Sequence, residues 1–207
     1  MALVLAYHGC KLETAQELLG GSPFLPSTQD YDWLGAGIYF WENDVLRAYQ
    51  WAKEHRGHFA RPTVIGAVIE LGNCLDLATQ TGIEAVKLAH KQFKAVLEKQ
   101  GASIPKNVDL VMNHSGDKVK RFLDCAVMNH LFNSVLRTVQ ESDPKSLPYS
   151  TVRALFPEGS KLYPGAGFRD KTHIQICVRE PEQILGVFRI PEWQSEELGL
   201  HSLYTRS

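Results

Sequence analysis

The last third of the sequence holds three β-prone segments with no helical pattern between them. They lie at 151–156 (TVRALF), 173–178 (HIQICV) and 186–190 (GVFRI). Neighbouring parallel strands need a long crossover connection, usually a helix, whereas antiparallel strands need only a turn. These segments therefore argue against a doubly wound parallel sheet. They predict an α+β fold with a mixed, mainly antiparallel sheet.

Strands and helices alternate in the first part of the chain. Apolar and β-branched runs predict strands at 2–7, 37–41 and 63–71. A short run at 74–77 is either a continuation of the third strand or a short neighbour. Helical patterns connect these strands, at 11–21 and at 45–55, where Asn43 or Asp44 is placed to cap the second helix.

Two amphipathic helices are predicted in the middle of the chain, over 82–100 and 117–140. Apolar residues recur there at the spacing of one helix face. The positions are Val86, Ala89, Phe93 and Val96 in the first helix, and Val119, Leu123, Val127, Leu131, Val135 and Val139 in the second. We expect residues 1–207 to form a single domain, with residues 80–142 as a helical insertion within it.

The charge of the chain argues against one class of partner. The 207 residues are 22% charged with a formal net charge of −1, which is not the composition of a polybasic nucleic-acid-binding protein. Residues 87–121 nevertheless hold eight Lys or Arg against three acidic residues. This excess is either a phosphate-binding face or, as is commoner for such runs, a solvated helix surface.

Cysteine spacing and the apolar pattern predict where the protein acts. Cys10, Cys74, Cys125 and Cys177 are separated by 64, 51 and 52 residues, which fits neither a zinc site nor a disulfide framework. The first apolar run has no basic leader, and no apolar run approaches the roughly 20 residues of a membrane helix. We expect reduced, mostly buried cysteines in a cytoplasmic protein without a membrane partner.

The motifs that carry chemistry are weak when each is taken alone. His8-Gly9 at a strand end is most often a turn or a buried structural pair. Gly35-Ala36-Gly37 precedes a strand, which excludes a Rossmann dinucleotide fingerprint. His55 and His58 have no third ligand nearby, so we expect no metal site.

In combination, the motifs resemble the ADP-ribosyltransferase superfamily, in the branch of diphtheria toxin and the poly(ADP-ribose) polymerases. The matching segments are YHG at 7–9, GAGIYF at 35–40, RAYQWA at 47–52 and HIQICVREPEQIL at 173–185. The resemblance covers the first 70 residues and roughly residues 150–190, and the helices between them have no counterpart. It implies a split sheet, and NAD as a substrate with no metal.

The resemblance assigns a role to each motif residue. His8 would hydrogen-bond a hydroxyl of the nicotinamide ribose, and Gly9 would present its backbone to the carboxamide. Tyr39 would stack on the nicotinamide ring, where stacking contributes about 0.5–1.5 kcal/mol beyond burial. Gly35 and Gly37 would allow a close approach or a sharp turn of the backbone.

Two further positions concern the nicotinamide and its ribose. Tyr49 or Trp51 would close the other face of the ring, and the choice stays open because the family's second aromatic residue falls nearest Gln50. Gln175 stands where the family usually has a glutamate that stabilises the positive charge as nicotinamide leaves. An amide hydrogen-bonds a hydroxyl group but supplies no full charge. In the alternative without a functional role, Gln175 is a polar residue that faces solvent on an edge strand.

The resemblance implies a mono-ADP-ribosyltransferase whose catalytic residues are His8, Tyr39 and Gln175. Its acceptor would be a protein or a nucleic acid, selected by the loop at 157–172, in which Phe168 and Arg169 are candidate contacts. Two alternatives stay open: NAD hydrolysis, and a non-catalytic NAD or ADP-ribose-binding module. A small transferase of this kind would suit a toxin or defence effector, with an antitoxin or regulatory partner.

Overall fold

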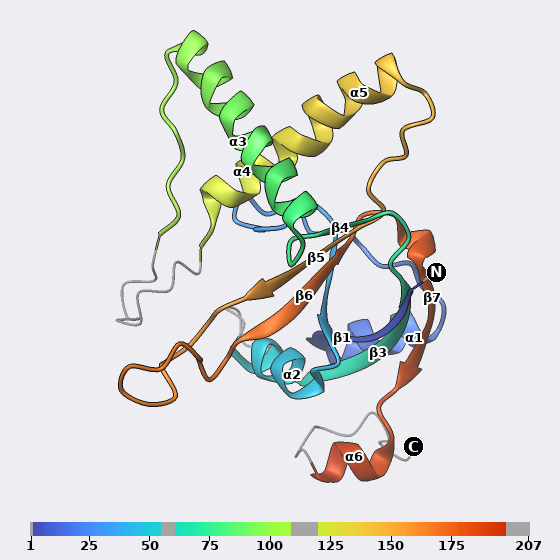
Figure 1. The fold of residues 1–207 in the computed structure, drawn as a ribbon. Coiled ribbons are helices and arrows are strands. Elements are labelled where there is room, and N and C mark those ends of the chain that lie inside the picture. The colour runs from blue at the N-terminus through green and yellow to red at the C-terminus, as the bar shows by residue number, and fades with distance from the viewer. Residues whose placement is uncertain (1, 55–60, 109–119, 198–207) are drawn as a thin grey trace.

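The fold is built on one curved sheet with helices packed around it (Figure 1). The computed structural model describes residues 2–54, 61–108 and 120–197. The sheet has seven strands in the order β4-β5-β6-β2-β1-β3-β7, and every neighbouring pair except β4–β5 is antiparallel. The strands are β1 Leu3–Lys11, β2 Ile38–Glu42, β3 Pro62–Glu70, β4 Cys74–Asp76, β5 Thr151–Phe156, β6 His173–Val178 and β7 Ile184–Arg189. The predicted α+β class with a mainly antiparallel sheet is confirmed.

The helices are regular except for one π-helical turn. They are α1 Leu12–Leu19, α2 Val45–Glu54, α3 Gln80–Gln100, α4 Phe122–His130, the π turn Leu131–Val135, α5 Leu136–Ser142, the short 3-10 turn Pro181–Gln183 and α6 Glu192–Glu197. Of the two predicted caps for α2, Asp44 is the one used, since its Oδ1 accepts from the backbone N–H of Arg47 at 2.8 Å.

The sheet narrows where β1 meets β2. These strands share only two residue pairs, Ala6 with Glu42 and Tyr7 with Trp41. Away from this joint β1 pairs with β3, and β2 pairs with β6. We expected a split sheet; the structure has one hydrogen-bonded sheet whose halves, β4-β5-β6-β2 and β1-β3-β7, meet at this narrow joint.

Separate apolar clusters hold helices to the two sides of the sheet. On one side, Leu12 and Leu18 of α1 pack against Ile65 of β3, next to a strand cluster that includes Phe40 and Ile176. On the other face of β5 and β6, Met128 and Phe132 of the α4–π turn segment pack against those strands. Burying a large apolar side chain contributes about 1.5–3 kcal/mol, so these clusters fix the helices against the strands.

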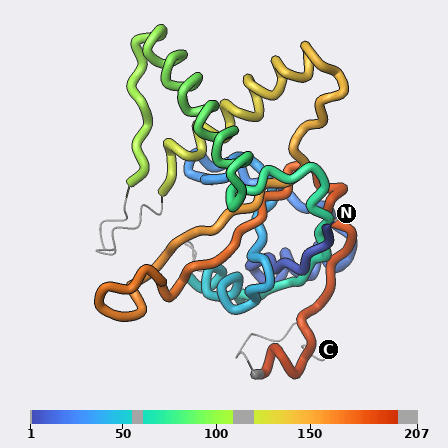
Figure 2. The backbone as a smooth tube through the Cα atoms, viewed as in Figure 1, coloured from blue at the N-terminus to red at the C-terminus, as the bar shows by residue number. Residues whose placement is uncertain are grey.

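Helices α3, α4 and α5 lie between β4 and β5 in the sequence and project from one side of the sheet (Figures 1 and 2). Because β4 and β5 are parallel, the chain needs a crossover between them, and these helices provide it. On α3 the predicted apolar face is buried at Ala89 but 39% exposed at Val96, where the helix extends beyond its partners.

The second predicted helix, 117–140, is not regular. α4 begins at Phe122, and residues 117–119 lie outside the described residues. The π turn at 131–135 adds a residue to one turn, which rotates the following helix and brings Phe132 and Leu136 toward the core. Val139, which the four-residue step assigns to the apolar face, is therefore 42% exposed.

Two strands differ from the sequence prediction. β1 runs on to Lys11, so His8 and Gly9 lie within the strand, paired with β3, instead of ending it. β4 is neither a continuation nor a neighbour of β3, because it pairs with β5 at the far edge of the sheet. Among the described helices, none has the length and apolar character needed to span a bilayer. The four cysteines are free, and three of them are buried, as expected.

Candidate functional site

His8 and Tyr39 are joined across the gap that opens between β1 and β2. The strands separate beyond the pair Tyr7–Trp41, and Nδ1 of His8 lies 2.9 Å from the backbone oxygen of Tyr39. On the other side of β2, Gln175 of β6 pairs in register with Trp41. The order β6-β2-β1 therefore places Gln175, Tyr39 and His8 on adjacent strands.

The contact with Tyr39 determines the protonation of His8. A carbonyl oxygen can only accept a hydrogen bond, so Nδ1 carries the proton. Burial lowers the pKa of the ring, which favours its neutral form and leaves Nε2 as an acceptor. Phe24 and Phe40 hold the ring, with centroid distances of 5.4 and 5.5 Å. His8 is thus a fixed, neutral acceptor beside the gap.

The Tyr39 side chain is fixed by the turn that precedes its own strand. Its hydroxyl donates to the oxygen of Gly35 at 2.7 Å and accepts from the N–H of Leu34 at 3.1 Å. Gly35 turns the chain with a φ of +84°. Burial raises the pKa of the phenol well above its usual value, so the hydroxyl stays protonated and keeps donating.

Close packing explains why positions 9 and 37 are occupied by glycine. A Cβ at Gly9 would overlap the carbonyl oxygen of Ala48, so α2 lies directly on β1 at this point. A Cβ at Gly37 would overlap Cys177 on β6. Both glycines therefore have a packing role that does not depend on a ligand, and they bring α2 and β6 close to the gap.

Trp33 covers Gln175. Nε1 of Trp33 donates to Oε1 of Gln175, and the indole ring lies edge-on to Phe156 at a centroid distance of 4.8 Å. The guanidinium of Arg121 lies over both rings, 5.2 Å from the Trp33 centroid and 4.3 Å from that of Phe156. Because β6 is an internal strand and Gln175 is half-buried, the alternative of a solvent-facing residue on an edge strand is wrong.

The side chains of the motif residues lie on both faces of the sheet. Tyr39 shares its face with Trp41, two residues further along β2, and hence with Gln175, the partner of Trp41. The ring of His8 contacts Phe40, whose side chain points to the opposite face. The ring of His8 therefore lies on the face of the sheet opposite to the side chains of Tyr39 and Gln175.

A buried ionic cluster beside Gln175 was not singled out by the sequence. Nη2 of Arg47 on α2 donates to Oε2 of Glu158 at 2.7 Å, and the two side chains are only 6% and 15% exposed. Nδ1 of His173 lies 3.9 Å from the same oxygen and 2.7 Å from the backbone oxygen of Lys171. Burial lowers the pKa of His173, which favours the neutral ring.

Several polar atoms of this cluster are buried without a hydrogen-bond partner. They are Nε and Nη1 of Arg47, Nε2 of His173 and Nε1 of Trp41. Among the described side chains only Oε1 of Gln183 shares this condition. Buried polar atoms are nearly always paired, so their concentration here indicates a place that holds bound water or a ligand. No local sequence signal reveals it, because Arg47 and Glu158 are 111 positions apart.

The two aromatic candidates on α2 are packed against the sheet. Tyr49 is buried in a cluster with Trp41 and Val64. Trp51 is half-buried, with its ring 5.3 Å from that of Trp41. Gln50, where the family's second aromatic residue would fall, is exposed. Of the two candidates, Trp51 is thus the more accessible.

The candidate acceptor loop at 157–172 has neither helix nor strand of its own. Lys161 and Arg169 form a bridge across it, and Nη1 of Arg169 donates to the oxygen of Gly159 at 2.7 Å. The ring of Phe168 is 67% exposed at the far end. Arg169 therefore braces the loop, and Phe168 is free to contact another molecule.

The basic residues of 87–121 do not form one uniform surface in the described part of the chain. Lys87 and Lys94 on α3 are exposed and pair with Glu84 and Glu98 within the helix. Arg121, in contrast, pairs with Asp124 at 3.4 Å and covers Trp33. Residues 109–119, which include Lys118, lie outside the described residues.

The described residues contain no group of three or more His, Cys, Asp or Glu side chains placed to hold a metal ion. His55 and His58 lie outside the described residues.

Comparison with known proteins gives one distant relative. The chain is 26% identical over 202 residues to an uncharacterised protein of Methanocaldococcus jannaschii, a match that covers 86% of this chain and 83% of the relative. No protein-family model and no solved structure matches the chain. The similarity therefore extends over nearly the whole length of both proteins.

Proposed function

We propose that the protein is a mono-ADP-ribosyltransferase, with a sheet of the ADP-ribosyltransferase type, that uses NAD as its substrate. The supporting observation is the placement of His8, Tyr39 and Gln175 on the adjacent strands β1, β2 and β6, at the point where the sheet opens. The three positions lie up to 167 residues apart in the chain. This adjacency of strands supports the proposal, although the ring of His8 lies on the face of the sheet opposite to Tyr39 and Gln175.

The contacts of His8 suit the role proposed for it. With Nδ1 donating to Tyr39, the neutral ring presents Nε2 as an acceptor for a ribose hydroxyl. Tyr39, held by Gly35 and Leu34, offers a ring of fixed orientation for the nicotinamide. Gln175 would contact the ribose once Trp33 has moved from its amide.

The proposed reaction is a substitution at the ribose carbon that bears nicotinamide. The acceptor nucleophile forms a bond to this carbon, the bond to nitrogen breaks, and nicotinamide leaves with the bonding electrons. The acceptor loses its proton to the medium and keeps one ADP-ribose. The role of the protein is to hold NAD in a reactive orientation.

A second candidate is a non-catalytic module that binds NAD or ADP-ribose. One observation favours it: Gln175 carries no charge, and its amide oxygen is already bonded to Trp33. A site of this kind binds the nicotinamide end of NAD without stabilising the cation that forms as the bond breaks.

Release of nicotinamide from NAD separates these candidates. The purified protein is incubated with NAD alone and with cell extract, and labelled extract is then digested with protease or nuclease. We expect release only with extract, and loss of the label on the digestion that destroys the acceptor. Release without extract indicates NAD hydrolysis, and NAD binding without release indicates the binding module.

Matched histidine variants test the site itself. We expect His8→Ala to abolish NAD binding, whereas His90→Ala, at an exposed position on α3, leaves it unchanged. Normal NAD binding and turnover in both His8→Ala and Tyr39→Ala would rule out the proposed site.

A further inference from the structure

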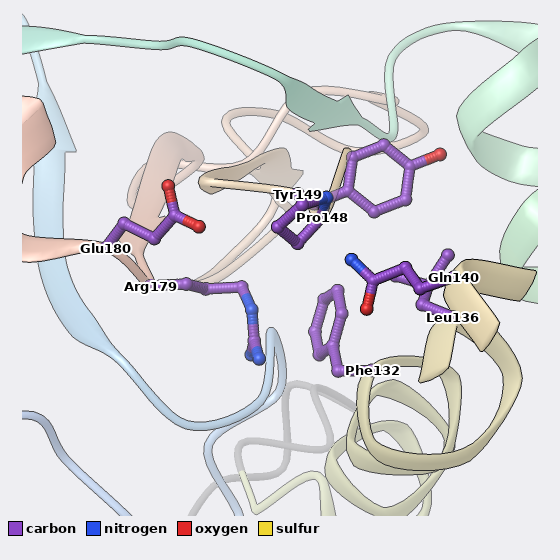
Figure 3. A pocket seen from close by; sticks show the side chains of 7 residues that line it. All are labelled: Phe132, Leu136, Gln140, Pro148, Tyr149, Arg179 and Glu180. Carbon is purple, nitrogen blue, oxygen red and sulfur yellow. The ribbon is translucent and has the colours of Figure 1, made fainter. Parts of the chain in front are cut away.

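A small pocket lies between α5 and the segments that flank β5 and β6 (Figure 3). Its volume is about 120 Å³. Its lining is mixed: Phe132, Leu136, Pro148 and Tyr149 contribute apolar groups, and Gln140, Arg179 and Glu180 contribute polar ones. A groove lined by Lys145 continues from it and shares Leu136 and Tyr149. The pocket is separate from His8 and Gln175, neither of which lines it.

The pocket contains a cation, Arg179, that forms no direct ion pair with a carboxylate among the described residues, although the charge of the neighbouring Glu180 acts on it. The guanidinium of Arg179 lies flat on Phe132, with Cζ 3.6 Å from the ring centroid, and Nη1 donates to the backbone oxygen of Ala36 at 3.2 Å. Among the described residues no carboxylate forms an ion pair with it. Half-buried charges are normally paired, and a guanidinium carries five N–H donors, of which one is used here.

The other polar groups favour a ligand anion at this cation. Figure 3 shows the amide of Gln140 beside Phe132 and Tyr149, where its N–H groups can donate to a ligand in the pocket. The carboxylate of Glu180 points away from the guanidinium in the same view. Lys145 in the adjoining groove adds a second positive charge.

We propose that this pocket binds a small organic carboxylate, whose charged end pairs with Arg179 and whose apolar body contacts Phe132, Leu136 and Tyr149. A guanidinium matches the two oxygens of a carboxylate, which gives both affinity and orientation. The pocket has room for a carboxylate on a single ring or a short chain.

The pocket is connected to the Gly35–Gly37 turn. Arg179 holds the carbonyl of Ala36, and Oδ1 of Asn129 on α4 accepts from the N–H of the same residue at 3.3 Å. A carboxylate that draws the guanidinium toward itself acts directly on this turn, which carries Tyr39 into β2. Binding in the pocket is independent of whether the protein uses NAD.

Calorimetric titration with benzoate tests the pocket. We expect saturable binding of benzoate to the wild-type chain, and binding of benzyl alcohol, its neutral analogue, that is about tenfold weaker or more. Arg179→Gln is expected to weaken benzoate binding about tenfold. Arg137→Gln is the matched control, because Arg137 on α5 is exposed and, among the described residues, forms an ion pair with Glu141 alone.

A second variant keeps the test valid if loss of Arg179 disturbs the turn. Gln140→Trp fills the pocket without removing the contact to Ala36, and we expect it to abolish benzoate binding while circular dichroism shows a folded protein. Equal binding of benzoate and benzyl alcohol, no binding by the wild type, or unchanged binding in Gln140→Trp would each overturn the proposal.

Discussion

The indole N–H of Trp33 donates to the side-chain oxygen of Gln175 at 2.5 Å, although the two residues are 142 positions apart. Trp33 is held in this place by Phe156 and by the guanidinium of Arg121. A ligand that donates to this amide oxygen competes with Trp33 for one of its two lone pairs. The segment before β2 therefore controls access to Gln175.

Removal of this hydrogen bond tests whether Trp33 competes with a ligand. Trp33→Phe keeps an aromatic ring against Phe156 but removes the donor. If NAD contacts Gln175, we expect affinity for NAD to rise about two- to tenfold, the value of one hydrogen bond. Calorimetry with NAD measures it, and Trp193→Phe, at a 67% exposed position, is the control. Weaker binding by Trp33→Phe would mean that the indole is part of the ligand site.

A carboxylate at position 175 supplies the charge that the amide lacks. We expect Gln175→Glu to raise the rate of nicotinamide release about 100-fold, which is the size of effect of one preorganised polar group that faces the charge developing in a transition state. Gln50→Glu adds the same charge at an exposed position and is expected to change nothing. Release is followed by chromatography. A variant that binds NAD without any release would favour the binding module.

The buried pair of Arg47 and Glu158 is predicted to matter for stability. Arg47→Met leaves the Glu158 carboxylate without its partner, which costs about 3 kcal/mol or more of unfolding free energy. The control Arg137→Met breaks an exposed pair and is expected to cost about 0.5 kcal/mol or less. Urea denaturation measures both values. Equal losses in the two variants would show that the buried pair adds nothing.

Stability is predicted to fall in mild acid. Burial lowers the folded-state pKa of His8 and of His173, so the unfolded chain binds more protons near pH 6. The two neutral rings therefore make their full contribution to the free energy of unfolding above about pH 6.5, the pKa of a free histidine. This contribution is lost as the pH falls toward the folded-state pKa. Melting temperatures from pH 8 to 5 measure the slope. We expect His173→Gln to flatten it and His90→Gln to leave it unchanged.

Local patterns in the sequence were sufficient for much of the fold. The strands at 151–156 and 173–178 have the predicted bounds, because their alternation and β-branched residues reflect their own backbone geometry. The helix of 117–140 was less well predicted, since the π turn at 131–135 depends on how Phe132 and Leu136 meet the sheet. β4 was assigned to the wrong neighbour because a three-residue strand carries no information about its partner.

The sequence by itself determined the α+β class and the candidate residues His8, Tyr39 and Gln175, since short motifs and periodic patterns are local. Only the tertiary structure decided that Trp33 covers Gln175, that Arg47 pairs with Glu158, and that Arg179 lines a pocket behind the Gly35–Gly37 turn. The physical reason is that the partners of buried polar groups are chosen by proximity in the folded chain. Contacts between positions that are far apart in the chain do not produce a repeating pattern of residue types in the sequence.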